Sequence, residues 1–217
     1  MAYAQPNGST FDVAATYSAV KTITGISNAN PAIATSTAHG LSKGDVVLLT
    51  SAWVKLNNRL FRVGEVTADT FELEGADTTN TVRYPAGGGA GTVKEVLTWI
   101  QIPQIMSVDY SGGEQNFYTW QFLESDDEMQ LPTNKTAISM TLVVADDPSQ
   151  PFVPVVEAYD ESRAVQALRL NLANGDSILY PAVVTITSTP TLTVNELMTR
   201  SISLAMQGRI SRYKAAA

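Results

Sequence analysis

A period-two alternation of apolar and polar residues is the feature that most restricts how this chain can fold. Alternation in β-branched and aromatic segments, with turn residues between them, predicts antiparallel β-strands. Ser111, Gly112 and Gly113 supply one such turn. The apolar residues that share a parity between Leu97 and Ala145 form three sets: Ile100, Ile102, Met106, Val108 and Tyr110; Tyr118, Trp120 and Phe122; and Ile138, Met140, Leu142 and Val144.

A second alternating segment, LRLNLANGDSILYPAVVTITS, predicts a tight hairpin. Asn174 and Gly175 mark its turn because both residues tolerate positive φ. Upstream, the proline-rich stretch Asp146–Pro154 interrupts the alternation, and residues Val155–Ala164 have the spacing of a short helix that lies across a sheet. The sequence therefore predicts a mainly β fold with one short helix.

Residues 25–94 have a different residue pattern, with short apolar runs every eight to twelve residues separated by turns. This spacing is typical of a small all-β module, and we read Tyr84–Thr92, which is rich in glycine, as a flexible return. The predicted division is a discontinuous main domain (1–24 and 95–217) with an inserted small β domain (25–94). Such an insertion is expected to be dispensable for the rest; the alternative is one continuous β fold. The polar ends, 1–10 and 208–217, are predicted to be flexible interaction arms.

Composition excludes several classes of function. The net charge of −7 over 217 residues argues against binding nucleic acid through its phosphates, and also against an anionic membrane surface. The absence of cysteine excludes disulfides and thiolate metal sites. We expect no signal peptide and no membrane-spanning segment, because no stretch has the required apolar pattern. A charged fraction of 16%, against about 25% in typical soluble domains, suggests a surface covered by neighbours.

Charge is segregated along the chain. Between Lys94 and Ala164 lie twelve acids against three bases, whereas no acid follows Glu196 and four bases remain. An acidic middle and a basic tail favour head-to-tail self-association, in which one copy's tail meets the next copy's acidic surface. The alternative is that the tail is charged for solubility alone.

Residues that could carry catalysis do not form a known arrangement. His39 is the only histidine, and although Asp45, Ser36 and Ser42 are near in sequence, one tight turn does not favour triad geometry, and there is no GxSxG motif. We interpret His39 as a turn residue whose ring caps local backbone. The acidic run 124–128 lacks the glycine and helices of a calcium-binding EF-hand, and no carboxylate pair is fixed for glycoside hydrolysis. The GGGAG run lacks the Lys-Ser/Thr of a phosphate-binding loop. No catalytic, metal or cofactor site is predicted.

The order of segments from Leu97 onwards resembles the major tail tube protein of long-tailed, siphovirus-type bacteriophages. Two strands flank the acidic excursion, then a strand at Ile138–Ala145 precedes the short helix, and the hairpin leads through a Thr/Pro loop to NELMTRSISLAMQGRI. The resemblance covers about two thirds of the chain. The segment containing HGLSKGD is similar to small β modules that recur in phage tail proteins, and the simplest tube proteins lack it at this place.

The resemblance implies a tail-tube-type β-sandwich or split barrel with one flanking helix, carrying an inserted small all-β domain. It also implies a structural subunit and not an enzyme. Six copies would close into a ring whose strands form an inner barrel, which removes free sheet edges. Stacked rings would form a channel through which DNA passes into the host without specific binding, because a negative lining repels phosphates.

The resemblance also implies partners, a location and sites. The partners are other copies of the chain, the tape measure protein, the tail terminator and tail tip proteins, with no membrane or cofactor; the location is the virion tail, after assembly in the host bacterial cytoplasm. The lumen would be lined by Asp109 and Glu114 or by Ser/Thr-rich strand faces. The residues assigned to contacts between copies are Glu124, Asp126, Asp127 and Glu128 in an inter-ring stacking loop, and Arg209, Arg212 and Lys214 in a C-terminal docking arm, together with the N-terminal arm.

Two alternatives remain open from the sequence. One is another ring-forming tail protein, a tail terminator or a distal tail protein, which would form a single ring. The other is a carbohydrate-binding or hydrolytic β domain, which would need an exposed aromatic platform or a placed pair of carboxylates. Trp53, Trp99 and Trp120 are scattered along the chain, and we predict that they lie in the core.

Overall fold

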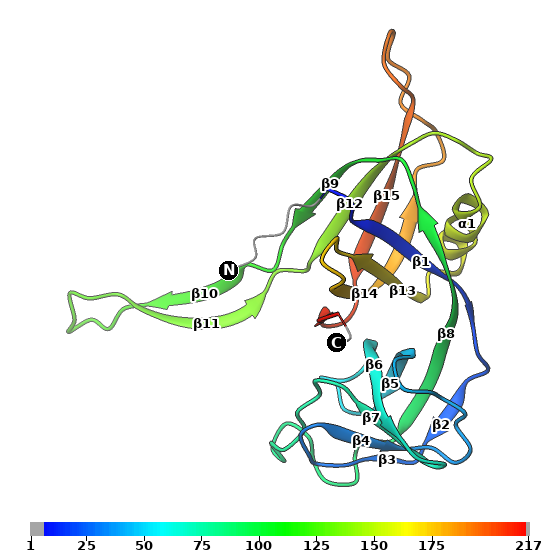
Figure 1. The fold of residues 1–217 in the computed structure, drawn as a ribbon. Coiled ribbons are helices and arrows are strands. Elements are labelled where there is room, and N and C mark those ends of the chain that lie inside the picture. Colours follow the sequence, from blue (N-terminus) through cyan, green and yellow to red (C-terminus); the bar gives the residue numbers. More distant parts are fainter. Residues whose placement is uncertain (1–6, 216–217) are drawn as a thin grey trace.

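The computed structural model describes residues 7–215 as a long, bent antiparallel sheet with one helix and a projecting hairpin (Figure 1). The prediction of a mainly β chain with one short helix is confirmed. The sheet is open, and its hydrogen-bonded order is β3-β4-β7-β6-β5-β8-β1-β13-β14-β15-β12-β9. The elements are β1 (Thr10–Tyr17), β2 (Lys21–Ile23), β3 (Gly25–Ile26), β4 (Ala32–Thr35), β5 (Val46–Ser51), β6 (Arg59–Val66), β7 (Thr70–Leu73), β8 (Gly91–Ile102), β9 (Ile105–Ser111), β10 (Gln115–Trp120), β11 (Met129–Lys135), β12 (Ser139–Ala145), α1 (Phe152–Ser162), β13 (Val165–Asn171), β14 (Ser177–Ile186), β15 (Thr199–Met206) and β16 (Ser211–Tyr213).

Strand β8 lies in the middle of the sheet and runs through both of its parts (Figure 1). Its first half pairs with β2 and β5, and its second half pairs with β1. The strand stops at Ile102 because Gln104, after Pro103, adopts a positive φ of 58°. The alternation from Leu97 to Tyr110 is therefore divided between two strands, β8 and β9, which lie in different parts of the sheet.

The main core lies between one face of the sheet and α1. Phe152, Val153 and Val156 of the helix are buried against inward-facing strand residues such as Leu142 and Ile202. The helix begins three residues before the predicted start, since Pro154 lies in its first turn, where no N–H is needed. It ends where Arg163 adopts a left-handed conformation. The hairpin of β13 and β14 has the predicted form, with Leu170 opposite Ile178 and a positive φ at Gly175.

A second core lies within residues 23–93 and contains Trp53, Phe61 and Phe71. The glycine-rich segment before β8 packs closely over this core. A Cβ added to Gly88 or Gly89 would come within 2.9 Å of the Trp53 ring or of Ile26, respectively. The interpretation of this segment as a flexible return is therefore wrong, because its glycines allow the backbone to approach a buried tryptophan.

A third, smaller cluster joins the 25–94 segment to the rest of the chain. Leu48 and Leu60 pack in it with Leu179 and Tyr213, all of them buried. Removing residues 25–94 would expose this surface, so the shared cluster argues against the expectation that the segment is dispensable. The division into 1–24 with 95–217 and 25–94 stays a prediction, and its boundary at residue 95 falls inside β8.

The chain end forms part of the fold. Strand β16 pairs with β14, and Ser211 and Tyr213 are buried. The expectation of a flexible arm over 208–217 is wrong for residues 211–213, because Tyr213 fills the shared cluster and its neighbours complete a strand pair. Of the predicted N-terminal arm, residues 1–6 lie outside the described residues, and Thr10 begins β1.

Candidate assembly surfaces

His39 is a buried structural residue. Its Nε2 lies 2.9 Å from the carbonyl oxygen of Thr67, and its Nδ1 accepts a hydrogen bond from the N–H of Leu41 at 3.0 Å. The ring also packs edge-on against Phe71. Both nitrogens thus contact backbone groups, and the bond from Leu41 confirms the interpretation of His39 as a turn residue whose ring caps local backbone.

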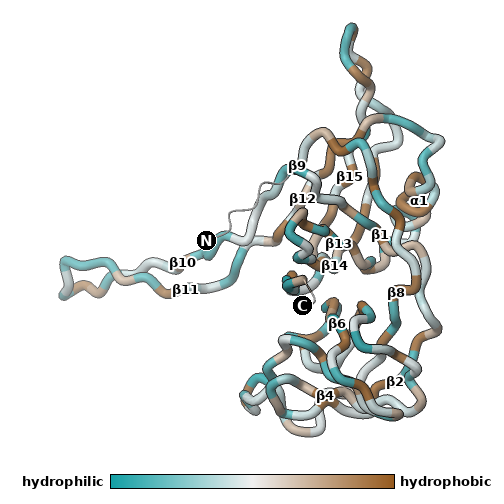
Figure 2. Tube along the Cα trace, viewed as in Figure 1, coloured by the Kyte–Doolittle hydropathy of each residue, from teal (hydrophilic) through white to brown (hydrophobic). Residues whose placement is uncertain are grey.

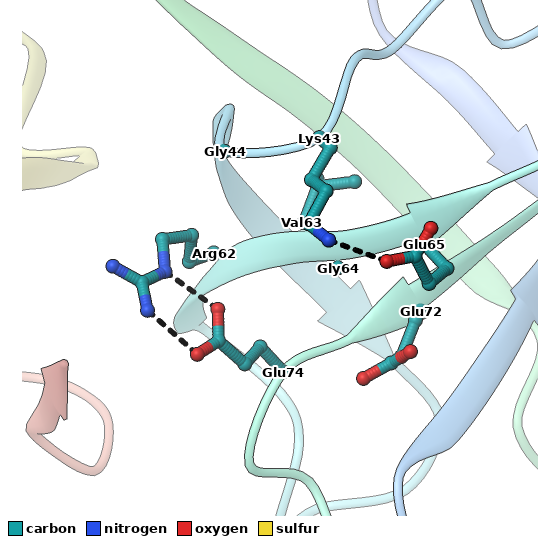
Figure 3. Close-up of a pocket in the computed structure, with 8 residues that line it drawn as sticks. All are labelled: Lys43, Gly44, Arg62, Val63, Gly64, Glu65, Glu72 and Glu74. Carbon is teal, nitrogen blue, oxygen red and sulfur yellow. Dashed lines mark hydrogen bonds and ion pairs between the residues drawn. The ribbon is translucent and has the colours of Figure 1, made fainter. Parts of the chain in front are cut away.

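A charged pocket of about 500 Å³ lies on the 25–94 segment, between β6, β7 and the turn at Lys43 (Figure 3). Arg62 makes a two-pronged ion pair with Glu74, at 2.5 and 2.6 Å, and Lys43 pairs with Glu65. Four of the charged side chains that line the pocket are thus paired with each other, and Glu72 lines it without an ion pair in the described chain. Among residues 7–215 no group of three potential metal ligands comes together, and no helix is long and apolar enough to cross a membrane.

The acidic run forms the tip of a free-standing hairpin made by β10 and β11 (Figure 1). The side chains of Glu124, Asp126, Asp127 and Glu128 are exposed, and none makes an ion pair with any residue of the described chain. Lys135, the nearest base along the chain, lies at the other end of β11. The structure therefore places these four residues together at the most distant point of the hairpin, with their charge uncompensated.

The same hairpin has an apolar face. Cross-strand pairing sets Tyr118 opposite Leu131 and Trp120 opposite Met129, so these four side chains share one side of the ribbon. Tyr118, Met129 and Leu131 are exposed, and apolar residues continue out along the hairpin in Figure 2. The prediction that Trp120 lies in the core is wrong, because its strand leaves the main sheet. Trp53 is buried as predicted, whereas Trp99 is half-buried beneath the guanidinium of Arg169.

The hairpin continues β9 and β12 through a glycine-dependent bend. Gly112 and Gly113 both have positive φ, and a Cβ on Gly112 would lie 1.9 Å from the carbonyl oxygen of Ala137. No side chain fits there, since real Cβ contacts are far longer. Glu114 follows the bend, and its N–H donates to the Thr136 hydroxyl at 3.0 Å, which places it at the root of the hairpin.

The outer face of the sheet beside the hairpin is rich in hydroxyl groups. Pairing places Asp109 opposite Thr141 and Thr141 opposite Ser203, so all three point away from the core. Asp109 is the only ionisable residue on this hydroxyl face. Its members are Ser107, Asp109 and Ser111 of β9; Ser139, Thr141, Val143 and Ala145 of β12; Thr199, Ser201, Ser203 and Ala205 of β15; and Val183 and Thr185 of β14.

Strand β9 ends the sheet and leaves one side of its backbone without a strand partner within residues 7–215. Its core-facing parity is also uncovered, with Met106, Val108 and Tyr110 each more than half exposed. An open edge beside exposed apolar side chains favours pairing with another chain. The sequence pattern alone grouped these residues on one strand parity with Ile100 and Ile102.

The basic residues of the chain end lie at the junction with the 25–94 segment. The side chains of Arg209, Arg212 and Lys214 are all exposed, and Arg212 pairs with Asp176 at 2.9 Å. Sequence reasoning missed Arg59, which lies beside them from the start of β6. No local signal reveals that proximity, because Arg59 lies in the 25–94 segment and Arg209 lies near the end of the chain.

Comparison with known proteins identifies the relationship of the chain. Residues 51–215 match the model of a family described as phage tail tube protein, TTP. No curated protein sequence matches. The solved structures that are similar include a cap of the anti-feeding prophage described as a tube terminating cap, with 21% identity, a TM-score of 0.39, and coverage of 53% of this chain and 83% of that one.

Two further solved structures are similar over the same share of the chain. One belongs to the virion of a native gene transfer agent particle, with 12% identity, a TM-score of 0.42, and coverage of 53% of this chain and 88% of that one. The other belongs to the sheath–tube complex of an extracellular contractile injection system, PVC, with 17% identity, a TM-score of 0.38, and coverage of 53% and 83%. Since the family model spans most of the sequence, the chain belongs to the phage tail tube protein family and is a structural protein, not an enzyme.

Proposed function

We propose that this protein self-assembles into stacked, hexameric rings that form the tail tube of a siphovirus-type phage, the channel for DNA passage into the host. The projecting hairpin carries the proposal. A two-stranded hairpin is at best marginally stable alone in water, and this one presents an apolar face formed by Tyr118, Trp120, Met129 and Leu131. It needs a partner surface, and in a tube that surface belongs to another copy.

Ring closure uses the open edge of the sheet. A second copy that pairs with β9 covers the unpaired backbone and the exposed side chains of Met106, Val108 and Tyr110, and closing the ring leaves no free edge. The strands beside β9 then form the inner wall, and their hydroxyl face lines the lumen with Asp109. Glu114, at the root of the hairpin, lies near the rim of that wall.

Stacking uses the acidic tip. Glu124, Asp126, Asp127 and Glu128 extend beyond the body of the subunit and contact the next ring, where their charge is compensated. The tape measure protein would occupy the lumen during assembly, and a tail terminator and tail tip proteins would close the two ends. The tube is assembled in the host cytoplasm and leaves the cell in the virion.

Reversing two charges at the tip tests the stacking role. We expect Asp126→Lys/Asp127→Lys to fold and to form rings, because both side chains are exposed, but not to lengthen into tubes. The matched control Asp160→Lys/Glu161→Lys makes the same change of charge at the end of α1. Electron microscopy of the concentrated proteins reads out tube length.

Tubes of normal length from the tip variant would reject the stacking role. A wild-type protein that forms closed rings and never lengthens would reject the tube itself and favour the alternative of a tail terminator or distal tail protein.

A further inference from the structure

A pocket of about 350 Å³ lies where the 25–94 segment meets the chain end. It is lined by Arg59 at the start of β6, by Glu74 and Gly75 after β7, and by residues 209–213. We call it the arginine pocket, because Arg59, Arg209 and Arg212 all line it. Its two nearby acids are already engaged: Glu74 by Arg62 and Asp176 by Arg212.

The side chain of Arg59 in this pocket is poorly hydrogen-bonded for its burial. Its Nε is buried and has no hydrogen-bond partner in the described chain, its guanidinium lies over the Phe61 ring, and its one hydrogen bond is a long contact of 3.4 Å to the Ser211 hydroxyl. Burial lowers the pKa of Arg59, and the charge of Arg209 lowers it further. Buried polar groups in native proteins are nearly always paired, so this arginine lacks an anionic partner.

We propose that the arginine pocket binds the acidic hairpin tip of a neighbouring copy, with Asp126 or Asp127 reaching Arg59 and Arg209. This inference rests on the proposed function and names the receptor surface for the stacking loop. A guanidinium fork matches a carboxylate, which accepts two parallel hydrogen bonds. The pocket therefore offers guanidinium groups to the unpaired carboxylates of the tip, and the tip supplies the carboxylate that Arg59 lacks.

The contact is between copies and cannot close within one chain. The hairpin projects away from the junction that holds the pocket (Figure 1), and its strands of six and seven residues span roughly 20 Å at the usual strand rise. Tip and pocket are different surfaces, so their contact is heterologous and gives each copy one donor end and one acceptor end. Heterologous contacts that do not close on themselves make open polymers, which is the geometry of a stack of rings.

A charge swap tests the pairing in the full-length protein. We expect Arg209→Glu and Asp127→Arg each to raise the critical concentration for tube formation about tenfold or more, the low end of the coupling between close charge pairs at interfaces. The double variant Asp127→Arg/Arg209→Glu should restore tube formation. Lys55→Glu, an exposed base outside the pocket, is the control and should leave it unchanged. Arg209 and Asp127 are exposed, so neither substitution threatens the fold.

Crosslinking gives an independent readout because the chain contains no cysteine. Oxidised tubes of Asp127→Cys/Arg209→Cys should give a ladder of covalent oligomers, and Asp127→Cys/Lys55→Cys should give none. Loss of tubes in Asp127→Arg with normal tubes in Arg209→Glu would overturn the pocket and leave the stacking function standing. Failure of the double variant to recover, or tubes without a ladder, would also overturn it. Normal tubes from both single variants would reject stacking through the tip as well.

Discussion

Replacing Tyr213 by phenylalanine tests how firmly the chain end joins the two parts of the fold. The Tyr213 hydroxyl accepts a hydrogen bond from the N–H of Arg62 at 3.1 Å and donates one to the carbonyl oxygen of Glu74 at 3.2 Å. The ring lies beneath the Arg62 guanidinium, 4.8 Å from its centre. One side chain thus connects β16 to β6 and to the turn after β7.

The loss of unfolding free energy in Tyr213→Phe comes from the hydrogen-bond partners that the missing hydroxyl leaves unpaired. Phenylalanine keeps the ring in the cluster with Leu60 and Leu179, so the packing term is small. The N–H of Arg62 loses its acceptor in a partly buried place, which costs about 1–3 kcal/mol. A loss of about 2 kcal/mol lowers the Tm of a chain of this size by roughly 4–8 °C.

Thermal unfolding of the monomer, followed by circular dichroism, measures this change. Tyr118→Phe is the matched control, because it removes a hydroxyl from an exposed side chain of the hairpin and should leave the Tm unchanged. Hydrogen exchange should become faster at β6 and β16 and stay slow at β12 and β15. A Tm within about 1 °C of the wild type, where even 0.5 kcal/mol would be visible, would refute the argument that this hydroxyl joins the two parts.

Two more predictions concern the hairpin root and the chain end. Gly112→Ala places a methyl group against the Ala137 carbonyl oxygen at a positive φ, so we expect a folded body with a displaced hairpin, seen as normal circular dichroism but no tubes; normal tubes would contradict the tight bend. The hydrogen bond from Arg212, with those from Ala215 and Asn174, lowers the pKa of Asp176, so its carboxylate stabilises β16 above its usual pKa of 3.8 and this contribution is lost as the pH falls through the depressed value. The Tm difference between wild type and Asp176→Asn should be constant near neutral pH and shrink in acid. A difference that grows in acid would contradict a stabilising role for the Asp176 carboxylate.

Local patterns predicted the elements whose partners are close in sequence. The hairpin at Asn174–Gly175 needed only turn chemistry and alternation, and the acidic tip needed only two alternating strands around a charged run. The break at Pro103 and Gln104 was missed because alternation continues in phase on both sides of it. Trp120 was misplaced because alternation reports a strand but not whether that strand leaves the sheet.

Features that depend on distant contacts were beyond local patterns. The last residues read as a polar basic tail, yet Tyr213 is buried because Leu60 and Leu179 provide a surface for it. Arg59 reads as an ordinary surface residue at the start of a strand. It becomes a candidate binding residue only when the fold brings it beside Arg209, and periodicity carries no information about that approach.

The hydroxyl face suggests how the proposed channel would let DNA slide. Asp109 is its only ionisable residue, so a six-membered ring would carry few negative charges on this wall, and strong repulsion is not needed. Binding to DNA requires cations that displace counterions from the phosphates. The hydroxyl face contains no lysine or arginine. Arg200 of β15 lies on the opposite face of the sheet, paired with Val144, and its guanidinium lies 3.2 Å from the carboxylate of Glu157. A lining of small hydroxyl side chains hydrates well and offers no charged contact. It is therefore the exclusion of bases from one strand face, more than the total negative charge of the chain, that would keep the lumen from retaining DNA.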